Sequence, residues 1–464
     1  MSFDLDQPDL PTDLPLLPDG WHWTALSRLV DQDRGICYGI VQPGKHHSDG
    51  VPMVNTGDVL DGRVNLDIGF RVEKKLHDQF RRSTLRGGEL LVTLVGANFG
   101  RVAIAPPEFA GYNCSRAVGV VPLTGSTEFV MFALRSPVAR HFFDTWANTT
   151  AQPTFNLKDL GRLPVPIPPV ESAKQISNML MALDDRITLL RETNATLEAI
   201  AQALFKSWFV DFDPVRAKAE GRQPEGMDAA TASLFPDSFE ESELGLVPKG
   251  WRVMPLGDIC SVTIGGLWGN DDSDDSELVP AISLRGVDLE HLRANGFSKE
   301  APVRWVKTTA MEKRRLSDRE VLVAASGAGP CGRPLWAGAP FEVIYGRPVI
   351  FSNFVKRLDC GSPARAVYVD RLLAEMRESS EIWNFINGTS VPNLDDKLLL
   401  STKRTVLPPD EVLSKFFDVA KTIYDSLYDQ KAQTLTQLRD TLLPRLISGQ
   451  LRLPEAETLL ENAL

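Results

Sequence analysis

The chain has 464 residues, of which 43% are hydrophobic and 24% charged, an ordinary composition for a globular protein of two domains with connecting elements. The start is acidic and proline-rich, and no apolar run reaches membrane-spanning length, so we expect neither a signal peptide nor a membrane span. The five cysteines are scattered without a C-x-x-C pair, which argues against a disulfide framework and a zinc knuckle and favours the reducing cytoplasm.

The formal net charge of -11 is unevenly distributed along the chain. Residues 1–20 carry five aspartates and no basic residue, and residues 211–245 carry nine acidic residues against three basic ones. These two segments account for the whole net charge, and residues 21–162 alone are slightly basic. The remaining parts can therefore present basic faces to a polyanion despite the acidic total.

One long internal repeat organises the chain. Its first copy begins with Leu17-Pro18-Asp19-Gly20-Trp21, which returns as Val247-Pro248-Lys249-Gly250-Trp251. Three further groups return in the same order. The second copy repeats Glu89-Leu90-Leu91-Val92 with Gly96, Gly100 and Arg101 as Glu320-Val321-Leu322-Val323 with Gly327, Gly332 and Arg333. It also repeats Asn148, Thr150 and Pro153 as Asn387, Thr389 and Pro392, and Ile167-Pro168-Pro169 as Leu407-Pro408-Pro409. The period is too long for a solenoid and predicts two copies of a domain followed by a helix.

Each copy is predicted to begin with an α+β domain, the first over residues 21–162 and the second over 247–406. The first domain mixes glycine and proline punctuation with short β-rich runs, which are Val51–Val54, Leu90–Val95, Val102–Ala105 and Ala117–Val121. In the second domain, Glu320–Ala325 matches the second of these runs. The remaining segments are predicted as an acidic tail at 1–20, an acidic linker at 214–246 and a C-terminal tail at 453–464.

A long helix is predicted within the central segment 163–213. Apolar residues repeat at alternating spacings of three and four over five heptads: Ala173, Ile176, Leu180, Leu183, Ile187, Leu190, Asn194, Leu197, Ala201, Leu204 and Trp208. From about 171 to 209 this helix would be roughly 58 Å long. It ends in the aromatic residues Phe205, Trp208, Phe209 and Phe212.

A second helical segment at 407–452 begins after Pro408-Pro409, slips near Gln430 and Lys431, and stops near Gly449. We expect the two helices to pair as an antiparallel coiled coil between the two domains, which would make the molecule pseudo-twofold. The alternative is that each helix packs on its own domain. Asn194 would either set the helix register or face water.

No catalytic motif stands out. The chain lacks a P-loop, because Gly96–Arg101 has no lysine, and it lacks the tetrapeptide and the glycine motif of an amino-methyltransferase. Glu73-Lys74-Lys75 is too common a pattern to indicate a nuclease, and His46-His47 has no third ligand at metal spacing. The sequence therefore predicts neither a catalytic site nor a metal site.

These features together resemble the specificity subunit of type I restriction-modification systems, over nearly the whole chain. The most specific segment runs from Leu183 to Val215, and Leu442–Leu451 resembles the family's C-terminal helical ending. The strand and glycine turn after Glu89 and after Glu320 resemble the same strand and turn in each target recognition domain. The common Gly-Asp at that strand appears here as Gly88-Glu89 and Arg319-Glu320.

The resemblance implies a DNA-binding subunit without chemistry of its own. Each recognition domain would read one half of a bipartite, asymmetric site in double-stranded DNA, and the helices would set the spacing. Two modification subunits would bind S-adenosylmethionine and methylate adenine, and motor-nuclease subunits would use ATP and Mg. The helical residues expected at the subunit interface are Ile187, Leu190, Asn194, Leu197, Leu204, Phe205, Trp208, Phe209, Leu435, Leu438, Leu442 and Leu446.

Candidate DNA contacts are chosen as residue types that bind base edges or phosphates. In the first domain they are Lys45, His46, His47, Lys74, Lys75, Arg81, Arg82, Asn98, Arg101 and Arg116. In the second domain they are Arg285, Arg304, Lys313, Arg314, Arg315, Ser326, Arg333, Arg347 and Asn353. Arg81-Arg82 and Lys313-Arg314-Arg315 occupy matching places before the Glu89 and Glu320 strands.

Two other functions stay open at this point. A coiled-coil scaffold with duplicated peptide-binding domains is favoured slightly by the acidic pI of 5.2. A nuclease fused to a recognition domain is disfavoured by the missing catalytic and motor motifs.

Overall fold

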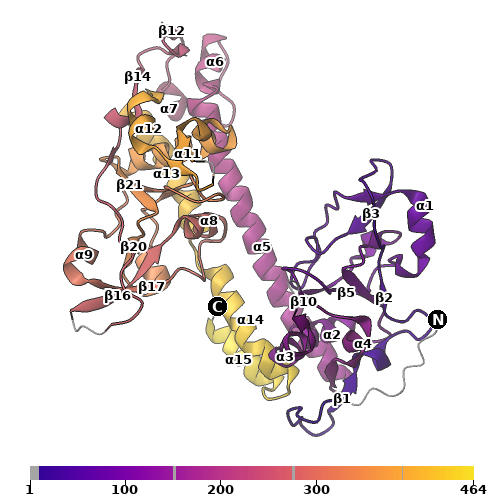
Figure 1. The fold of residues 1–464 in the computed structure, drawn as a ribbon. Helices are drawn as coiled ribbons and strands as arrows, with labels where there is room; N and C mark the ends of the chain where they lie inside the picture. The colour runs from indigo at the N-terminus through magenta and orange to yellow at the C-terminus, as the bar shows by residue number, and fades with distance from the viewer. Residues whose placement is uncertain (1–9, 150–152, 274–276, 389, 464) are drawn as a thin grey trace. The chain divides into compact units, whose positions relative to one another are not determined.

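The computed structural model describes residues 10–149, 153–273, 277–388 and 390–463 (Figure 1). Contacts divide the chain into two units: unit 1 joins the residues up to Thr188 to those from Thr434 onward, and unit 2 is Leu189–Gln433. Thr150 and Thr389 of the repeat lie outside the described residues, as do residues 1–9 of the predicted tail. No described helix combines the length and the apolar character needed to cross a membrane.

The described residues of the first domain, which lies in unit 1, form four small groups of strands and four short α-helices. β1 (His22–Ala25) pairs antiparallel with β11 (Pro164–Ile167). A four-stranded antiparallel sheet has the order β2 (Cys37–Tyr38), β8 (Val118–Val121), β5 (Leu90–Thr93), β6 (Val102–Ile104). A three-stranded group has the order β4 (Arg71–Val72), β3 (Val51–Val54), β7 (Asn113–Cys114), and a hairpin joins β9 (Asn148–Thr149) to β10 (Pro153–Thr154). The helices are α1 (Lys74–His77), α2 (Thr127–Leu134), α3 (Pro137–Trp146) and α4 (Leu157–Arg162).

Unit 2 repeats this plan strand for strand. β14 (Arg252–Pro255) pairs with β24 (Arg404–Leu407), and a four-stranded sheet has the order β15 (Ser261–Val262), β21 (Val355–Asp359), β18 (Glu320–Ala324), β19 (Pro334–Trp336). The three-stranded group is β17 (Val303–Lys307), β16 (Leu278–Leu284), β20 (Val349–Phe351), and the hairpin is β22 (Ile386–Asn387) with β23 (Asn393–Leu394). Its helices include α8 (Gly286–Asn295), α9 (Thr308–Glu312), α10 (Phe341–Tyr345), α11 (Pro363–Glu378) and α12 (Asp396–Thr402).

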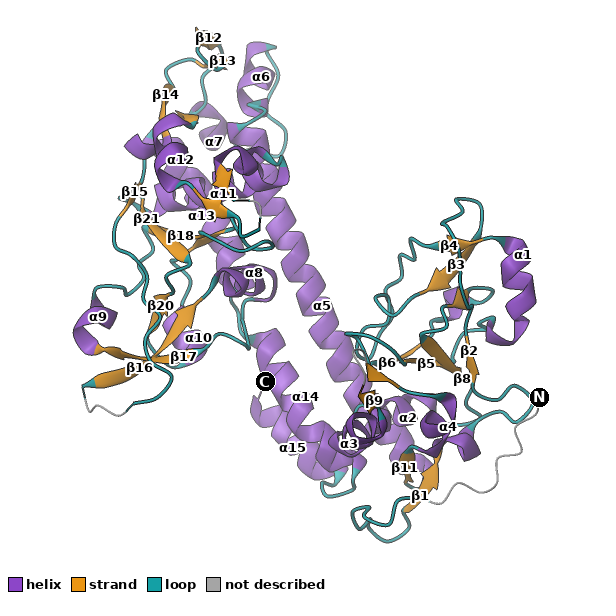
Figure 2. Cartoon of the chain, in the orientation of Figure 1, coloured by secondary structure: helices purple, strands orange, loops and turns teal. Residues whose placement is uncertain are grey.

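The two four-stranded sheets agree in order and direction, which confirms the repeated α+β fold. Figure 2 shows that helices and strands are mixed in both units. Their central strands, β5 and β18, are buried along their full length and are apolar except for Thr93 and Glu320. The five β-rich runs predicted from the sequence correspond to β3, β5, β6, β8 and β18. Burial on both faces explains why these runs read as continuous apolar stretches rather than as an alternating pattern.

The same turn chemistry recurs at the start and end of the central strand. Glu89 and Glu320 are both buried, and each accepts a hydrogen bond from the backbone N–H three residues earlier, at 2.7 Å from Arg86 and 2.9 Å from Ser317. After the strand, Gly96 and Gly327 both have positive φ, at 93° and 108°, which favours glycine. Glutamate thus fills a structural role at both departures from the family's Gly-Asp.

The predicted long helix is present as α5 (Val170–Phe209), a single helix of 40 residues. In unit 2 it packs against α13 (Asp410–Leu427): the rings of Phe205 and Phe416 lie 6.1 Å apart, and Asn194 Nδ2 donates to the Leu427 carbonyl at 3.4 Å. These contacts run in opposite order along the two helices, so α5 and α13 are antiparallel there. Asn194 is buried, so the water-facing alternative is wrong. A coiled coil through both units and the pseudo-twofold axis stay predictions.

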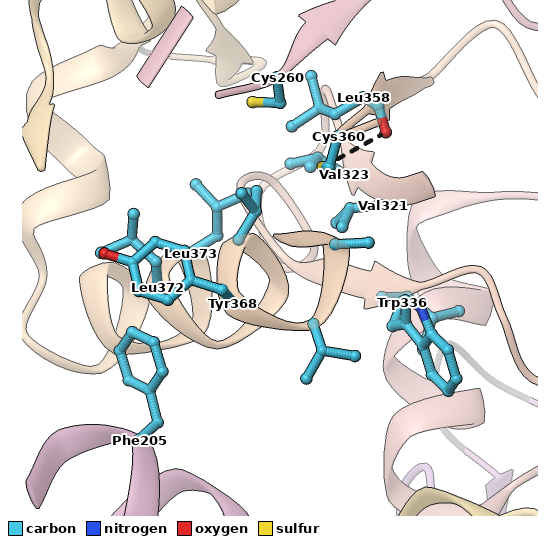
Figure 3. Close-up of a cluster of buried hydrophobic side chains, with 14 of the residues drawn as sticks. Phe205, Cys260, Val321, Val323, Trp336, Leu358, Cys360, Tyr368, Leu372 and Leu373 are labelled. Atoms are coloured by element: carbon cyan, nitrogen blue, oxygen red, sulfur yellow. Dashed lines mark hydrogen bonds between the residues drawn. The ribbon is translucent and has the colours of Figure 1, made fainter. Parts of the chain in front are cut away.

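The hydrophobic core of unit 2 gathers around α11, which also packs against α13 of the same repeat. Figure 3 shows Phe205 of α5 pointing toward Tyr368 on α11, with Trp336 of β19 near the far end of that helix. The rings of Phe205 and Tyr368 lie 5.5 Å apart. The second helical segment therefore contacts its own domain as well as α5.

Two predicted boundaries need correction at the C-terminal end. The helix expected over 407–452 is interrupted after Leu427 and resumes as α14 (Lys431–Ile447), at the place where the heptads slip. Residues 453–464 were expected to form a tail, but Leu453–Ala463 form helix α15. Leu453, Ala456 and Leu460 follow helical spacing, and burial of Ala456 explains why this short segment is ordered.

The acidic linker expected at 214–246 is a folded part of unit 2. It contains α6 (Asp213–Ala219), α7 (Ala229–Ser233) and the hairpin of β12 (Phe239–Ser242) with β13 (Gly245–Pro248). Val215 and Phe235 are buried in the core of the unit, and Phe235 packs against Trp208 at 5.1 Å between rings. Its acidic residues therefore lie on a structured surface.

Candidate nucleic-acid interface

In unit 1 the short strand β4 gathers several of the candidate basic residues. The exposed loop with Lys45, His46 and His47 is held to β4, because Arg71 N donates to His46 Nδ1 at 3.3 Å and His47 N donates to the Arg71 carbonyl at 3.0 Å. Helix α1 starts directly after β4 and exposes Lys74 and Lys75. The fold thus brings five candidates from two separate sequence segments to one strand.

The other candidates of unit 1 have more varied surroundings. Arg81 and Arg82 are exposed on the 3-10 helix Asp78–Ser83, where Arg82 Nε donates to the Arg34 carbonyl at 2.8 Å. Asn98 donates to the Thr56 carbonyl at 3.2 Å, and Arg101 donates to the Val59 carbonyl at 3.5 Å. These last two half-buried side chains fix the β5–β6 turn. Arg116 is exposed after β7.

In unit 2 most candidate arginines already have a carboxylate partner in the same unit. The ion pairs are Arg285 with Asp288 at 2.9 Å, Arg304 with Asp271, Arg315 with Glu342 at 2.6 Å and Arg333 with Glu290 at 2.6 Å. Arg304 is buried beneath Trp268, 4.4 Å from the ring centroid, which fits a structural role. Arg314 donates to the Gly265 carbonyl at 2.8 Å.

Four candidates of unit 2 lie on loops. Lys313, Arg347 and Asn353 are exposed, and Ser326 is half-buried beside the β22–β23 hairpin, where it forms a bridge with Asn393. The basic groups before the central strands occupy equivalent places in both units. Arg81 and Arg82 follow α1 and precede β5, whereas Lys313–Arg315 follow α9 and precede β18. The structure shows these positions, and DNA contact by any of these side chains stays a prediction.

The residues predicted at the subunit interface lie largely inside the chain. Ile187, Asn194, Phe205, Trp208, Phe209, Leu435, Leu442 and Leu446 are buried, and Leu190, Leu197, Leu204 and Leu438 are half-buried. The aromatic residues pack within unit 2, with Phe209 and Phe416 rings 5.0 Å apart. The heptad positions therefore stabilise the chain itself and leave little surface for another subunit.

A different face of α5 is exposed. Between Thr193 and Ala203 the exposed residues are Thr193, Ala195, Thr196, Ala199, Ile200 and Ala203, and none of these is charged. Ile200 is 45% exposed, and Leu189, one turn before Thr193, is 52% exposed. Such an uncharged helical face is suited to packing against another helix. In unit 1, a groove of about 1400 Å³ is lined by residues that include Trp21, Met179 and Leu453.

Sequence reasoning missed a buried ionic network in unit 2, formed by side chains from four helices. Glu198 on α5 accepts from both terminal nitrogens of Arg371 on α11, at 2.8 and 3.0 Å, and from Arg293 Nε on α8 at 2.7 Å. Arg293 also holds both oxygens of Asp370, at 3.0 and 3.1 Å. Tyr424 on α13 accepts from Arg371 Nε at 2.9 Å and donates to Asp370.

The network is neutral and its side chains are well partnered, which buried charges require. Burial alone would raise the pKa of Glu198, but the neighbouring charges of Arg293 and Arg371 lower it to about 2. Asp370 and Arg371 are completely buried in the middle of an apolar helical run. This adjacent charged pair between Val369 and Leu372 is the sequence signal that could have indicated the network.

Unit 1 has a simpler counterpart. Arg135, at the C-terminal end of α2, donates to Asp184 on α5 at 2.6 Å and lies 3.2 Å from Asp61. Arg439 on α14 donates to the other oxygen of Asp184 at 2.7 Å. Each unit therefore holds α5 through a carboxylate between two arginines. Among the described residues, no group of three or more His, Cys, Asp or Glu is arranged to hold a metal ion.

Comparison with known proteins gives matches to specificity subunits of type I restriction enzymes. Residues 45–199 match the type I restriction modification DNA specificity domain. The chain is 33% identical to the type I restriction enzyme EcoBI specificity subunit of Escherichia coli, over 40% of this chain and 42% of that relative. It is 24% identical to the HindI specificity subunit of Haemophilus influenzae, over 86% of this chain and 94% of that relative.

Among solved structures, the chain is similar to the S subunit of a type I restriction-modification system from M. genitalium. The TM-score is 0.52 at 16% identity, and the match covers 94% of this chain and 97% of that one. This likeness supports the fold, while the sequence matches carry the relationship. The chain is thus similar, over most of its length, to type I restriction enzyme specificity subunits.

Proposed function

We propose that this chain is the DNA sequence-specificity subunit of a type I restriction-modification complex. The observation that carries the proposal is the repeat itself: two domains with one strand order and different loops. A protein that reads two unlike half-sites needs a shared scaffold with separate contact residues, because base readout depends on side chains at the surface. The similarity to specificity subunits supports the same role.

Each domain would contact one half of a bipartite target in double-stranded DNA. In unit 1, the residues around β4 and α1 offer the exposed positive charge that phosphate binding needs. In unit 2, Lys313, Arg315, Arg347 and Asn353 are the exposed candidates, and Arg315 is paired with Glu342. We assign the paired Arg304 to the fold rather than to DNA.

The chemistry would belong to partner subunits. Two modification subunits would bind S-adenosylmethionine and transfer the methyl group to adenine, and motor-nuclease subunits would use ATP and Mg. We propose that the uncharged exposed face of α5, around Ala195, Ala199 and Ile200, contacts a helix of a modification subunit. The buried heptad positions would support this face from within.

Two measurements test the proposal. Genome-wide methylation sequencing of a host with and without this gene is expected to show one bipartite methylated sequence that depends on the gene. The purified chain alone, incubated with DNA and S-adenosylmethionine, is expected to transfer no methyl group. Methylation by the isolated chain would contradict the non-catalytic role, and loss of the gene without loss of any methylated sequence would contradict the function.

The alternative, a scaffold with duplicated peptide-binding domains, makes a different prediction. Such a protein would give no shift of duplex DNA in a gel, either alone or with its modification subunits. The family match disfavours this alternative.

A further inference from the structure

We propose that the ionic network at Glu198 is a specificity determinant: it fixes the angle between α5 and the second recognition domain, and so helps to set the gap between the two half-sites. This inference rests on the proposed function and adds a residue to it. Glu198 would be a positioning residue, since its carboxylate is occupied by two arginines and it would act through α5. Its partners, Arg371 and Arg293, come from two different helices of the recognition domain.

The geometry of these contacts favours a directional role. Two parallel hydrogen bonds from Arg371 to both oxygens of Glu198 fix the plane of the carboxylate, and Arg293 binds it from a second direction. Gln202, one turn further along α5, donates to Glu375 on α11 at 2.8 Å. Apolar contacts such as Phe205 with Tyr368 also constrain the helix, but they depend less on bond direction than charge-assisted hydrogen bonds do. The polar contacts therefore define the angle.

The length of α5 makes this angle important. The helix continues for 28 residues from Glu198 back to Val170, which is about 42 Å at 1.5 Å per residue. A change of roughly 5° at Glu198 would move the far end by about 4 Å, comparable with the ~3.4 Å step between base pairs. A change of a few degrees in the angle at this joint would thus change the gap between the half-sites by about one base pair. Because a changed gap also rotates the half-site around the DNA axis, we expect weaker discrimination rather than its loss.

The joint of unit 1 has the same design. Asp184 on α5 lies between Arg135 of the first domain and Arg439 of α14. Each unit is therefore connected to the same helix by a carboxylate held between two arginines. The same kind of attachment therefore recurs at both domain–helix joints, as the internal repeat leads us to expect.

The test uses the complex with its modification subunits and the substitution Glu198→Gln, which keeps the shape and removes the charge. Methylation rates are measured on duplexes with the natural gap and with one base pair more or fewer. We expect the ratio of the rate on the natural gap to the rate on a shifted gap to fall by about tenfold. One mismatched base pair in a target has an effect of this size on binding. The preferred sequence of each half-site should not change. Glu171→Gln, an exposed glutamate on the same helix, is the matched control.

The outcomes separate this inference from the proposed function. An unchanged ratio in a folded Glu198→Gln complex would overturn the inference and leave the DNA-specificity role intact. A wild-type complex that methylates without sequence preference would overturn the proposed function instead. If Glu198→Gln does not fold, Arg293→Lys keeps the positive charge but loses the forked geometry, and the same fall in the ratio is expected. An unchanged ratio in that variant would also overturn the inference.

Discussion

Arg135 and Arg371 occupy equivalent positions in the two repeats, and each donates to a carboxylate on α5. Each lies nine residues after the serine of a Gly-Ser pair, Ser126 or Ser362, that precedes the matching helix. Arg135 binds Asp184 at 2.6 Å, and Arg371 binds Glu198 at 2.8 Å. The repeat therefore preserves the side chain that attaches each domain to the central helix.

The two arginines should differ in their contribution to stability. Arg371→Ala leaves Arg293 as the one arginine of the network facing the two buried carboxylates of Glu198 and Asp370, and should lower the free energy of unfolding by about 3–5 kcal/mol. Arg135→Ala should cost less, since Asp61 is 56% exposed and Asp184 keeps Arg439. Urea denaturation of both variants measures the difference. An equal or larger cost for Arg135→Ala would contradict this ranking.

Acid should weaken unit 2 through Glu198. The pKa of Glu198 in the fold is about 2, below its ordinary value of 4.5, so the folded state favours the charged form. Its contribution is complete above about pH 4.5 and is lost as the pH falls through about 2, a change of about 3 kcal/mol. Denaturation of the wild type and of Glu198→Gln from pH 6 to pH 2 should therefore give curves that converge toward acid. A constant difference between the curves would disprove this role.

Much of this fold could be predicted because its signals are local or repeated. The heptads predicted α5 to within one residue at its start, and the β-rich runs predicted the central strands, since continuous apolar runs indicate buried elements. The helix break after Leu427 coincides with the predicted slip. In contrast, α15 and the folded acidic segment were missed, because their order depends on a few buried residues such as Ala456 and Phe235.

The candidate site was less predictable, because residue type does not show which partner a side chain has. Arg304 and Lys75 look equivalent in the sequence, but Arg304 is buried in an ion pair with Asp271, whereas Lys75 is exposed on α1. The network around Glu198 joins residues up to 226 positions apart, which no local pattern reveals. Only the tertiary fold separates contact candidates from structural arginines.

Trp208 should matter for the stability of unit 2. It is 7% exposed and lies against Phe235 and Phe416, with ring separations of 5.1 and 5.8 Å. Trp208→Ala removes a large ring from this packed site and should lower the free energy of unfolding by about 3–5 kcal/mol. Thermal or urea unfolding measures the cost, and Leu244→Ala, at an exposed apolar side chain of the same unit, is the control. If Trp208→Ala lowered the free energy of unfolding by less than Leu244→Ala does, the aromatic cluster would not be tightly packed.

Phosphate contact by α1 can be tested through salt dependence. Lys75 is exposed on α1, and if it neutralises one phosphate, Lys75→Ala should weaken binding to all duplexes and reduce the slope of log K against log salt by about 1. Gel shifts with the assembled methyltransferase at several salt concentrations provide the slope. Lys158→Ala, an exposed lysine on α4, should leave the slope unchanged. An identical slope in wild type and Lys75→Ala would remove α1 from the DNA interface.

Exchange of one whole domain tests the two-reader model most directly. The segment 21–162 begins next to β1 and ends just before β11, two strands that pair with each other, so its entry and exit lie side by side and it can be replaced as a piece. Replacement with the corresponding segment of another family member should change one half of the methylated sequence and leave the other half and the gap unchanged, because base readout resides within each domain.

A one-heptad insertion into both helices, beside Asn194 and beside Lys431, should do the opposite and change only the gap. Methylome sequencing reads all three quantities at once. If the domain exchange altered both halves, or if the target were continuous, separate reading of two half-sites by the two domains would be wrong.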